Sequence, residues 1–484
     1  MKSLLTGAAV FAVACSLAFL GSGAPALAQS GDPEMLHPRL GVREVVSGLN
    51  LPTTMAFVDH ERMLVLEKST GQVQLVEGGA VQATVLDLAV NSASERGLLG
   101  IALHPDFQDN PSVYLYWTES TTGADTDVFA ETPLLGNRVD RYLWDGAALT
   151  FAQSLINIRA IQEDAGQPER GNHDGGVMSF GPDGRLYVFV GDLGRRGQMQ
   201  NLPCGPTVPC PPTVADDQFG GPQPDDAHLS GVVLRLNADG TTPSDNPFFA
   251  AGAQIGGEVG ANLQKVFSYG HRNGFGMAFD PDSGALWAQE NGDDSFSELN
   301  RLDAGTNGGW IQVAGPLSRI SQFKEIEMTF GAMQLQQLRW PPSNIADSPA
   351  EAQARMFQLP GATYSDPEFS WKWEVAPGGI GFVEGPSLGP QFAGDLFMGA
   401  ATPALEGGYL FHFNITGNGR AVGVDDPRLN DRVADNLAKH ELTESESLLI
   451  GRDFGVVTDI RMGPNGNLFV VSLSRGAVFE IFRK

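Results

Sequence analysis

Short apolar runs separated by Gly- and Pro-containing turns recur along the whole chain. The stretch SFGPDGRLYVFVGD (179–192) is typical, with an apolar run, a Pro-Asp-Gly turn and a second run rich in β-branched and aromatic residues. Pro and Gly at these positions allow the chain to reverse tightly. The pattern therefore predicts a β-hairpin in this stretch.

The same hairpin pattern is repeated at long and uneven intervals. Its other copies are residues 55–76, 101–117, 277–293 and 460–481, with a looser copy at 381–399. A repeated β-meander of this kind is typical of a propeller rather than a sandwich. We therefore predict an all-β fold, a six-bladed β-propeller of four-stranded antiparallel blades with long loops on one face. It would form one domain over residues 29–484.

Helical patterns are few. Residues 348–359 (SPAEAQARMFQL) and 431–442 (DRVADNLAKHEL) are the best candidates for helices. Neither changes the predicted class.

Two polar residues flank the hairpin of residues 179–192. If Gly181 faces Gly184 across the turn, continued pairing places His173 opposite Asp192 at the open end. A histidine oriented by a carboxylate is a typical general base, although two polar loop residues can also meet there by chance. In a propeller, such strand ends surround a central channel where a ligand would bind.

The N-terminus has the pattern of a cleaved signal peptide. A charged start, an apolar run and an A-x-A motif predict cleavage after Ala28, so residues 1–28 would be removed and the protein would be periplasmic or secreted. No later segment reaches the ~20 apolar residues that span a bilayer. In an oxidising compartment, Cys204 and Cys210 would by default form a small disulfide-closed loop, and their spacing does not match a zinc site.

The chain is strongly acidic, with a formal net charge of −26. This charge makes nucleic acid and anionic membranes poor partners. It favours divalent cations, although solubility alone also accounts for it.

Five ordered motifs resemble the soluble glucose/sorbosone dehydrogenase family, and the resemblance extends over nearly the whole mature chain. They are ERGLLGIALHPDF (95–107), NHDGGVMSFGPDGRLYVFVGD (172–192), GVVLRLNADGTTPSDNPF (231–248), GHRNGFGMAFDPDSGALW (270–287) and ENGDDSFSELNRLDAGTNGGW (290–310). The family consists of six-bladed propellers that oxidise aldoses with pyrroloquinoline quinone (PQQ). The resemblance implies an exported quinoprotein that oxidises an aldose or a related sugar or alcohol. The sequence does not identify its electron acceptor.

The resemblance also implies roles for single residues around the hairpin. His173 takes the place of the catalytic base, and Asp192 takes that of the carboxylate that orients it. Asn172, beside the base, and Glu95, before the GLLG motif, correspond to cofactor-binding positions.

The cofactor and metal positions of the family fall in the fourth repeat. Arg272 and Asn273 in GHRN would face the quinone. Calcium (Ca²⁺) would be held by the backbone carbonyls of Gly292 and Asp293 and by the carboxylate of Glu298, since hard cations prefer several oxygen ligands.

The sequence departs from the family at the basic residues that would bind the anionic quinone. The family uses a lysine late in the fifth blade and two arginines before the last turn. Here residues 395–411 contain no lysine, and residues 456–458 are Val-Val-Thr. Each missing charge-assisted hydrogen bond would be worth about 1.5–3 kcal/mol. Arg452, a few residues upstream, is a cation that could substitute through a different loop path.

This departure leaves two further functions open. One is a calcium-dependent hydrolase or lactonase on the same propeller, in which a metal polarises a carbonyl and a histidine or carboxylate activates water. The other is a non-catalytic binding propeller that has lost the quinone, because a fold does not fix a function.

Overall fold

The computed structural model describes residues 31–161, 171–194, 201, 229–330 and 342–484. The predicted signal peptide and the two cysteines, Cys204 and Cys210, lie outside these ranges.

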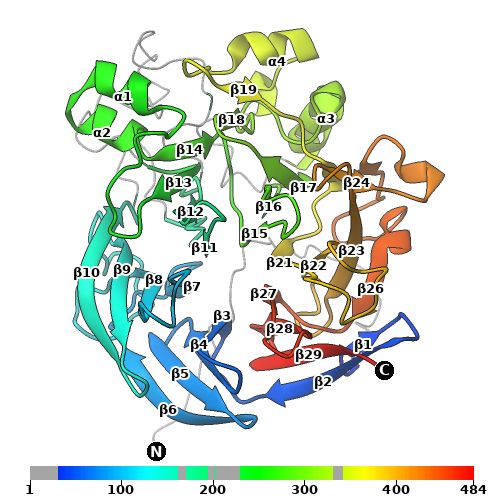
Figure 1. The fold of residues 1–484 in the computed structure, drawn as a ribbon. Helices are drawn as coiled ribbons and strands as arrows, with labels where there is room; N and C mark the ends of the chain where they lie inside the picture. The colour runs from blue at the N-terminus through cyan, green and yellow to red at the C-terminus, as the bar shows by residue number, and fades with distance from the viewer. Residues whose placement is uncertain (1–30, 162–170, 195–200, 202–228, 331–341) are drawn as a thin grey trace, which may run out of the picture.

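The described residues form six small sheets, each with a core of four antiparallel strands. They follow one another around a ring as blades (Figure 1). From the inner to the outer strand, the first three blades are β3 (Pro52–Phe57), β4 (Arg62–Glu67), β5 (Gln72–Glu77) and β6 (Ala80–Asp87); β7 (Leu98–Leu103), β8 (Ser112–Thr118), β9 (Asn137–Trp144) and β10 (Leu149–Ile158); and β11 (Met178–Phe180), β12 (Leu186–Val190), β13 (Val232–Leu236) and β14 (Val266–Tyr269).

The last three blades complete the ring and carry short additional strands. In the same order they are β15 (Gly276–Phe279), β16 (Leu286–Glu290), β17 (Ser295–Leu302) and β20 (Phe369–Trp373); β21 (Pro377–Phe382), β22 (Leu396–Ala400), β23 (Tyr409–Thr416) and β26 (Leu449–Arg452); and β27 (Val457–Met462), β28 (Leu468–Ser472), β29 (Ala477–Arg483) and β2 (Leu40–Val46). The additional strands are β18 (Thr306–Asn307) and β19 (Thr363–Tyr364) on the third blade, β25 (Val433–Ala434) on the fourth, and β1 (Glu34–Met35) and β24 (Ala421–Gly423) on the fifth.

The predicted propeller is confirmed, because every repeat of the hairpin pattern falls on the inner strands of one blade. Consecutive inner strands contact one another around the whole ring, from β3 through β7, β11, β15, β21 and β27 back to β3. The apolar core is divided in the same way, with one buried cluster between each pair of neighbouring blades. Each blade therefore buries both of its faces against its neighbours.

The ring is closed by strands from the two ends of the chain. The early strand β2 pairs antiparallel with β29, with Val42 opposite Ile481. This pairing gives the sixth blade its outermost strand and joins an early strand to the last strand of the chain.

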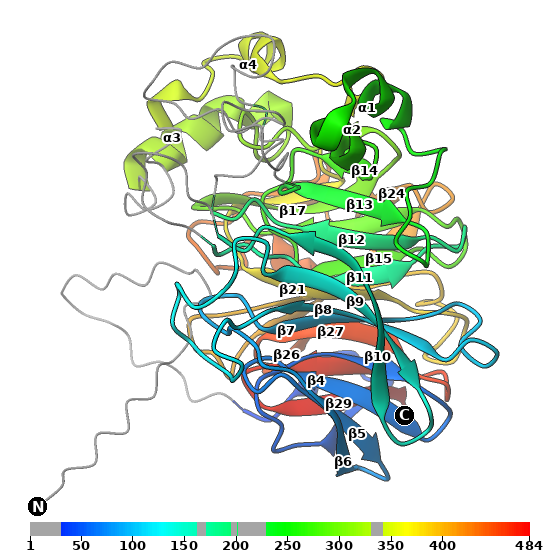
Figure 2. The same cartoon turned by 90° about the vertical axis from the view of Figure 1, so that its left-hand side faces the viewer.

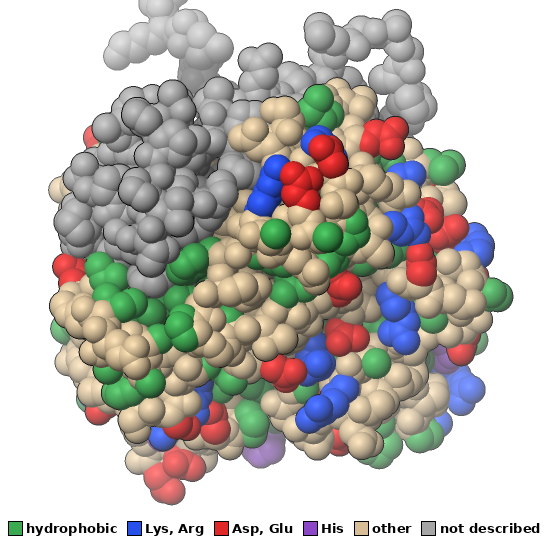
Figure 3. Space-filling model, turned by 90° about the horizontal axis from the view of Figure 1, so that it is seen from above, with side chains coloured by type: hydrophobic (Ala, Val, Ile, Leu, Met, Phe, Trp, Pro, Cys, Tyr) green, Lys and Arg blue, Asp and Glu red, His purple; other side chains and the backbone are tan. Residues whose placement is uncertain are grey.

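Helices lie on one side of the ring, beyond β14 and β17 (Figures 1 and 2). They are α1 (Phe249–Ile255), α2 (Gly257–Leu263), α3 (Ile320–Phe330) and α4 (Pro349–Arg355), with single 3-10 turns at Leu317–Arg319, Pro342–Asn344, Pro427–Leu429 and Ser445–Leu448. Acidic and basic side chains are interspersed over this side (Figure 3). In the described part of the chain, no helix has both the length and the apolarity needed to cross a membrane.

One of the two predicted helices is confirmed and the other is wrong. Residues 348–359 contain α4, and the Ser348 hydroxyl caps it by accepting a hydrogen bond from the Glu351 amide at 3.2 Å. Residues 431–442 form no helix. The buried Asn436 side chain bonds backbone groups of the fourth blade there, and such bonds compete with a helix.

Candidate active site

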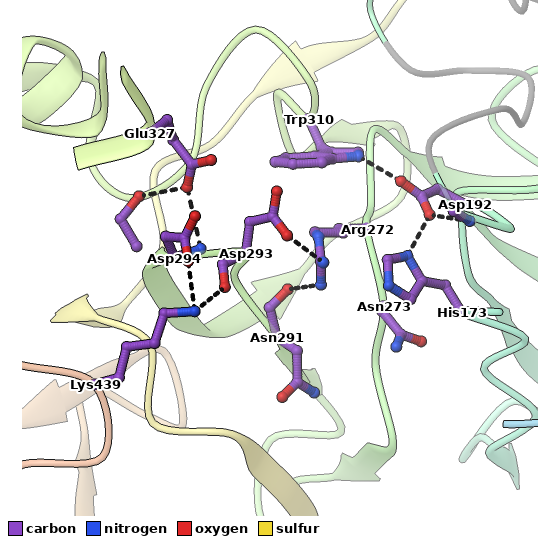
Figure 4. A network of polar contacts seen from close by, with 12 residues as sticks. His173, Asp192, Arg272, Asn273, Asn291, Asp293, Asp294, Trp310, Glu327 and Lys439 are labelled. Carbon is purple, nitrogen blue, oxygen red and sulfur yellow. Dashed lines mark hydrogen bonds and ion pairs between the residues drawn. The ribbon is translucent and has the colours of Figure 1, made fainter. Parts of the chain in front are cut away.

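The candidate site lies where the inner strands of several blades begin. Glu95 precedes β7, His173 precedes β11, and Arg272 and Asn273 precede β15. Inner strands run in the same direction in every blade, so these residues meet at one end of the central channel. Figure 4 shows His173, Asp192, Arg272, Asn273 and Trp310 facing one another there.

His173 and Asp192 are in direct contact. The His173 Nδ1 atom lies 2.7 Å from Asp192 Oδ1, and both side chains are buried. His173 has a φ of 62°, a left-handed conformation that is uncommon for a residue with a side chain. Such strain persists where the surrounding structure holds it, and it is common at functional sites.

The route by which the two residues meet differs from the prediction. Phe180 pairs with Leu186 and Met178 with Val188, one residue away from the register that a Gly181–Gly184 pair would give. The cause is the turn, because the Gly181 amide donates to Arg185 O, and three residues form the loop instead of two. His173 is therefore not directly opposite Asp192, and their side chains meet beyond the end of the ladder.

Asp192 is held by two further donors. The Trp310 indole Nε1 donates to Asp192 Oδ2 at 2.8 Å, and the Gly194 amide donates to Oδ1 at 2.9 Å. Trp310 comes from the long segment after β17, which the repeat pattern does not describe. Its role is therefore missing from the sequence analysis, although the GGW tripeptide lies inside a family-like motif.

Glu95 joins the base-bearing loop to the loop of Arg272 and Asn273. Its Oε2 atom accepts hydrogen bonds from the His173 amide at 2.8 Å and from Asn273 Nδ2 at 3.0 Å. Two buried polar atoms in this cluster, His173 Nε2 and Asn273 Oδ1, have no hydrogen-bond partner in the part of the chain that the structure describes. Asn172 is partly exposed beside the base, and its predicted role is not tested.

Arg272 is fixed by three residues of the following hairpin. Its guanidinium donates to Asp293 Oδ1 at 3.0 Å and to Asn291 O at 2.8 Å, and its amide donates to Glu290 Oε2 at 2.7 Å (Figure 4). The guanidinium also lies 5.7 Å from the centre of the Trp310 ring. Arg272 is therefore a cation held directly beside the base and its carboxylate.

The predicted calcium ligands do not fit a calcium ion in this arrangement. The Asp293 carbonyl accepts a hydrogen bond from Lys439 Nζ at 3.0 Å. The two carboxylate oxygens of Glu298 accept from the Gly315 amide at 2.6 Å and from Asn300 Nδ2 at 2.9 Å. Among the described residues, no three His, Cys, Asp or Glu side chains are grouped to hold a metal.

Burial and the neighbouring Glu290 also raise the pKa of Glu298 to about 8. Two neighbouring buried carboxyl groups disfavour each other's charged form.

Lys439 is a cation at the site that the sequence analysis did not identify. Its Nζ atom lies 2.5 Å from Asp294 Oδ1 (Figure 4). It belongs to the fifth blade, but to the insertion between β24 and β26 rather than to residues 395–411. The proposed substitute, Arg452, does not reach the site, because its exposed guanidinium bonds Glu34 Oε2 at 2.7 Å on the outer edge of the blade.

A partly open cavity of about 100 Å³ lies in the central channel. Its wall is mostly apolar, and Glu95, Asn291 and Lys68 contribute polar atoms to it. Further along the same inner strands, Arg461 Nε donates to Asp459 Oδ2 at 2.7 Å. This ion pair comes from the middle and end of β27, so it lies away from the end at which His173 is found.

The family model for glucose/sorbosone dehydrogenases matches residues 49–350. An uncharacterised protein of Synechocystis is 26% identical over 448 residues, which are 90% of this chain and 84% of that protein. Quinoprotein glucose dehydrogenase B of Acinetobacter calcoaceticus is 31% identical over 277 residues, 56% of this chain and 52% of that protein. The chain thus matches about half the length of this quinoprotein.

Solved structures agree on the fold. The PQQ-bound aldose sugar dehydrogenase of Streptomyces coelicolor superposes with a TM-score of 0.54 and 24% identity, over 92% of this chain and 98% of that one. Since the family model covers more than half of the chain, the protein belongs to the glucose/sorbosone dehydrogenase family.

Proposed function

We propose that the protein oxidises a hydroxyl group of an aldose or a related alcohol, with PQQ as the electron acceptor and His173 as the general base. The observation that carries this proposal is the buried His173 ring, which is held by Asp192 through Nδ1 and has an Nε2 atom without a partner among the described residues.

The contacts of Asp192 determine what His173 can do. A carboxylate accepts hydrogen bonds but does not donate them, so Nδ1 carries the proton and Nε2 keeps its lone pair. The lone pair can take the proton of a substrate hydroxyl. Asp192 then stabilises the imidazolium that forms, and Trp310 with Gly194 keeps the carboxylate in place.

The residues near the base fit an anionic quinone. Arg272 and Lys439 supply hydrogen-bond donors, although Asp293 and Asp294 balance their charges. Asn273 Oδ1 has no partner among the described residues and could accept a further hydrogen bond. When bound, the quinone would supply the acceptor for the two electrons and the hydrogen that leave the substrate carbon as hydride. Proton and hydride then leave separately, and the alcohol becomes a carbonyl.

The function is tested by titrating the protein with PQQ and then measuring dye reduction with a panel of aldoses. We expect saturable quinone binding and sugar-dependent dye reduction, which His173→Gln abolishes. The matched control is His412→Gln. His412 forms the same kind of pair, with Nε2 2.7 Å from Asp395 Oδ2, but it lies on β23 in the fifth blade.

Two outcomes would contradict the proposal. If micromolar PQQ does not bind, the protein does not use this cofactor, and ester and lactone hydrolysis should be assayed. If His173→Gln and His412→Gln both keep full dye reduction, His173 is not the base.

A further inference from the structure

The ammonium group of Lys439 lies on the loop that the family resemblance assigns to calcium. It donates to the Asp293 carbonyl at 3.0 Å and pairs with the Asp294 carboxylate at 2.5 Å. The carbonyl of Asp293 is one of the predicted calcium ligands. A protein cation therefore binds an oxygen that the metal would need.

The backbone around Lys439 is fixed to the fourth blade. The Trp373 amide donates to Asn436 Oδ1 at 2.8 Å, and Asn436 Nδ2 donates back to Trp373 O at 3.1 Å. The His440 amide donates to Glu374 O at 2.9 Å, and the Glu374 amide donates to Asp294 O at 3.2 Å. These bonds on both sides of Lys439 hold its side chain over the loop.

A second anchor comes from α3. The Glu327 carboxylate, which is fully buried, accepts hydrogen bonds from the Asp294 amide at 3.2 Å and from Ser295 Oγ at 3.0 Å. The loop is thus held by its own blade, by Glu327 of α3 and by the insertion that carries Lys439 (Figure 4).

The charges of the loop are matched by side-chain cations. The Asp293 and Asp294 side chains are only 3% and 7% exposed. Arg272 pairs with the first and Lys439 with the second. Buried carboxylates need such partners, because removing one leaves an uncompensated charge away from water. A calcium ion at the Asp293 carbonyl would have to displace the ammonium group, since two cations on one oxygen repel each other.

We propose that Lys439 is the resident cation of the Asp293–Asp294 loop and that it weakens calcium binding there. The expectation of calcium at this loop comes from the same family resemblance as the proposed function. The competition itself needs neither the quinone nor catalysis.

The test is calorimetric titration of the full-length protein with Ca²⁺, in the absence of quinone. We expect Lys439→Met to bind Ca²⁺ at least tenfold more tightly than the wild type. The matched control is Lys324→Met. Lys324 lies on α3, and its ammonium group pairs with the exposed Asp347 carboxylate at 2.5 Å. Lys324→Met should bind Ca²⁺ as the wild type does.

Thermal unfolding gives a second measurement that is independent of the calorimetric titration. The wild-type midpoint should be the same in EDTA and in millimolar Ca²⁺. The Lys439→Met midpoint should fall in EDTA and recover in Ca²⁺, whereas Lys439→Arg, which keeps the charge, should behave as the wild type. If Lys439→Met binds Ca²⁺ no more tightly than the wild type, or its midpoint does not respond to Ca²⁺, Lys439 does not compete with Ca²⁺ for the Asp293–Asp294 loop.

The two proposals fail in different ways. Loss of PQQ binding or of sugar oxidation in the wild type would refute the proposed function and leave the calcium titrations unaffected. Equal calcium affinities in the wild type and Lys439→Met would refute the role of Lys439 and leave His173 as the proposed base.

Discussion

The Asp192 carboxylate is contacted by His173, Gly194 and Trp310. Hydrogen bonds to a buried charged group are worth about 1.5–3 kcal/mol each. The indole of Trp310 is therefore expected to keep Asp192, and through it the His173 ring, in one orientation. We regard Trp310 as a positioning residue, because it acts through Asp192.

Trp310→Phe removes the indole N–H and keeps an aromatic ring. Losing one charge-assisted bond should lower kcat for sugar oxidation by roughly tenfold or more, at about 1.4 kcal/mol per factor of ten, with little change in KM. Steady-state kinetics measure this. Trp287→Phe is the control, since its indole donates to Gly419 O at 3.3 Å in the apolar cluster between the fourth and fifth blades. Equal kcat values in the two variants would show that Trp310 does not position the base.

Asp174, next to the base, is a buried acid with an unusual pKa. Burial raises its pKa to about 7, and the nearby Arg96 opposes this shift only in part. Its Oδ2 atom has no hydrogen-bond partner among the described residues, while Oδ1 accepts from Asn137 Nδ2 at 2.9 Å. Below about pH 7, the folded protein therefore holds a proton at Asp174.

This proton makes the stability of the fold depend on pH. In the unfolded chain the Asp174 carboxyl titrates near pH 4, so between about pH 4 and 7 the folded state binds more protons than the unfolded state. The free energy of unfolding should fall as pH rises through this window, by at most about 1.4 kcal/mol per pH unit for one proton. Asp174→Asn should remove that slope.

Urea unfolding at pH 5.0, 5.75 and 6.5 measures the effect of Asp174→Asn. Asp145→Asn is the control, because hydrogen bonds from the Ala147 and Ala148 amides lower the pKa of the exposed Asp145, which therefore does not titrate in this range. A slope that Asp174→Asn leaves unchanged would mean that the folded protein does not hold this proton.

At the scale of elements, the insertion between β24 and β26 is anchored in part by the Asn436 side chain. Asn436 Nδ2 donates to the carbonyls of Trp373, Ala438 and Glu441, each at 3.1 Å, and its Oδ1 accepts from the Trp373 amide. Directly before Asn436, β25 adds to the edge of β20 as a parallel strand. The bonds of Asn436 also help to determine where Lys439 lies.

Asn436→Ala should therefore loosen the insertion without unfolding the propeller. We expect the free energy of local opening to fall by about 2 kcal/mol, so amide exchange over residues 433–441 should accelerate roughly 30-fold. Hydrogen exchange followed by mass spectrometry reports this. Ser348→Ala, which removes one cap from α4, should leave exchange in this segment unchanged; equal protection in Asn436→Ala would contradict the anchoring role.

The hairpin of β11 and β12 shows which features a local sequence pattern predicts and which it does not. The Pro-Asp-Gly turn correctly predicted the reversal and the meeting of His173 with Asp192. The register was wrong by one residue, because turn residues do not by themselves specify whether two or three of them form the loop. Gly184, with a φ of 70°, provides the left-handed residue that the longer loop needs.

At the scale of the whole molecule, the repeated hairpins were sufficient to predict the propeller, since each repeat is one blade and must pack on its neighbours. The partners of the site could not be predicted in the same way. Trp310 and Lys439 lie in insertions between repeats, and their positions depend on contacts such as those of Asn436 rather than on a periodic pattern. The family motifs identified His173, Asp192 and Arg272 because those residues lie at the ends of regular strands.

Closure of the ring by β2 should contribute to its stability. A chain that lacks residues 31–46 loses the buried Leu40 and Val46 and leaves β29 as an open edge. With about 1.5–3 kcal/mol for each large buried side chain, we expect the thermal midpoint to fall by roughly 5 °C.

Calorimetry measures this effect, and adding a peptide of residues 31–46 should restore part of the lost midpoint. Arg43→Ala is the control. It removes the contacts of a largely exposed arginine with Glu480 and with the Phe482 ring across the same pair of strands, which should cost about 1 kcal/mol. A truncated chain with the wild-type midpoint would show that the ring does not need this strand.

The same closure has a consequence for the time during which the chain is being made. Val42 pairs with Ile481, so β2 is synthesised early and its partner almost last. At about 5–20 residues per second, β2 waits roughly 20 to 90 seconds without a partner. An unpaired strand can join another chain, and charged side chains oppose this. Arg43 and Glu44 are both exposed at the centre of β2. Their charges should reduce aggregation of the unpaired strand until β29 has been synthesised.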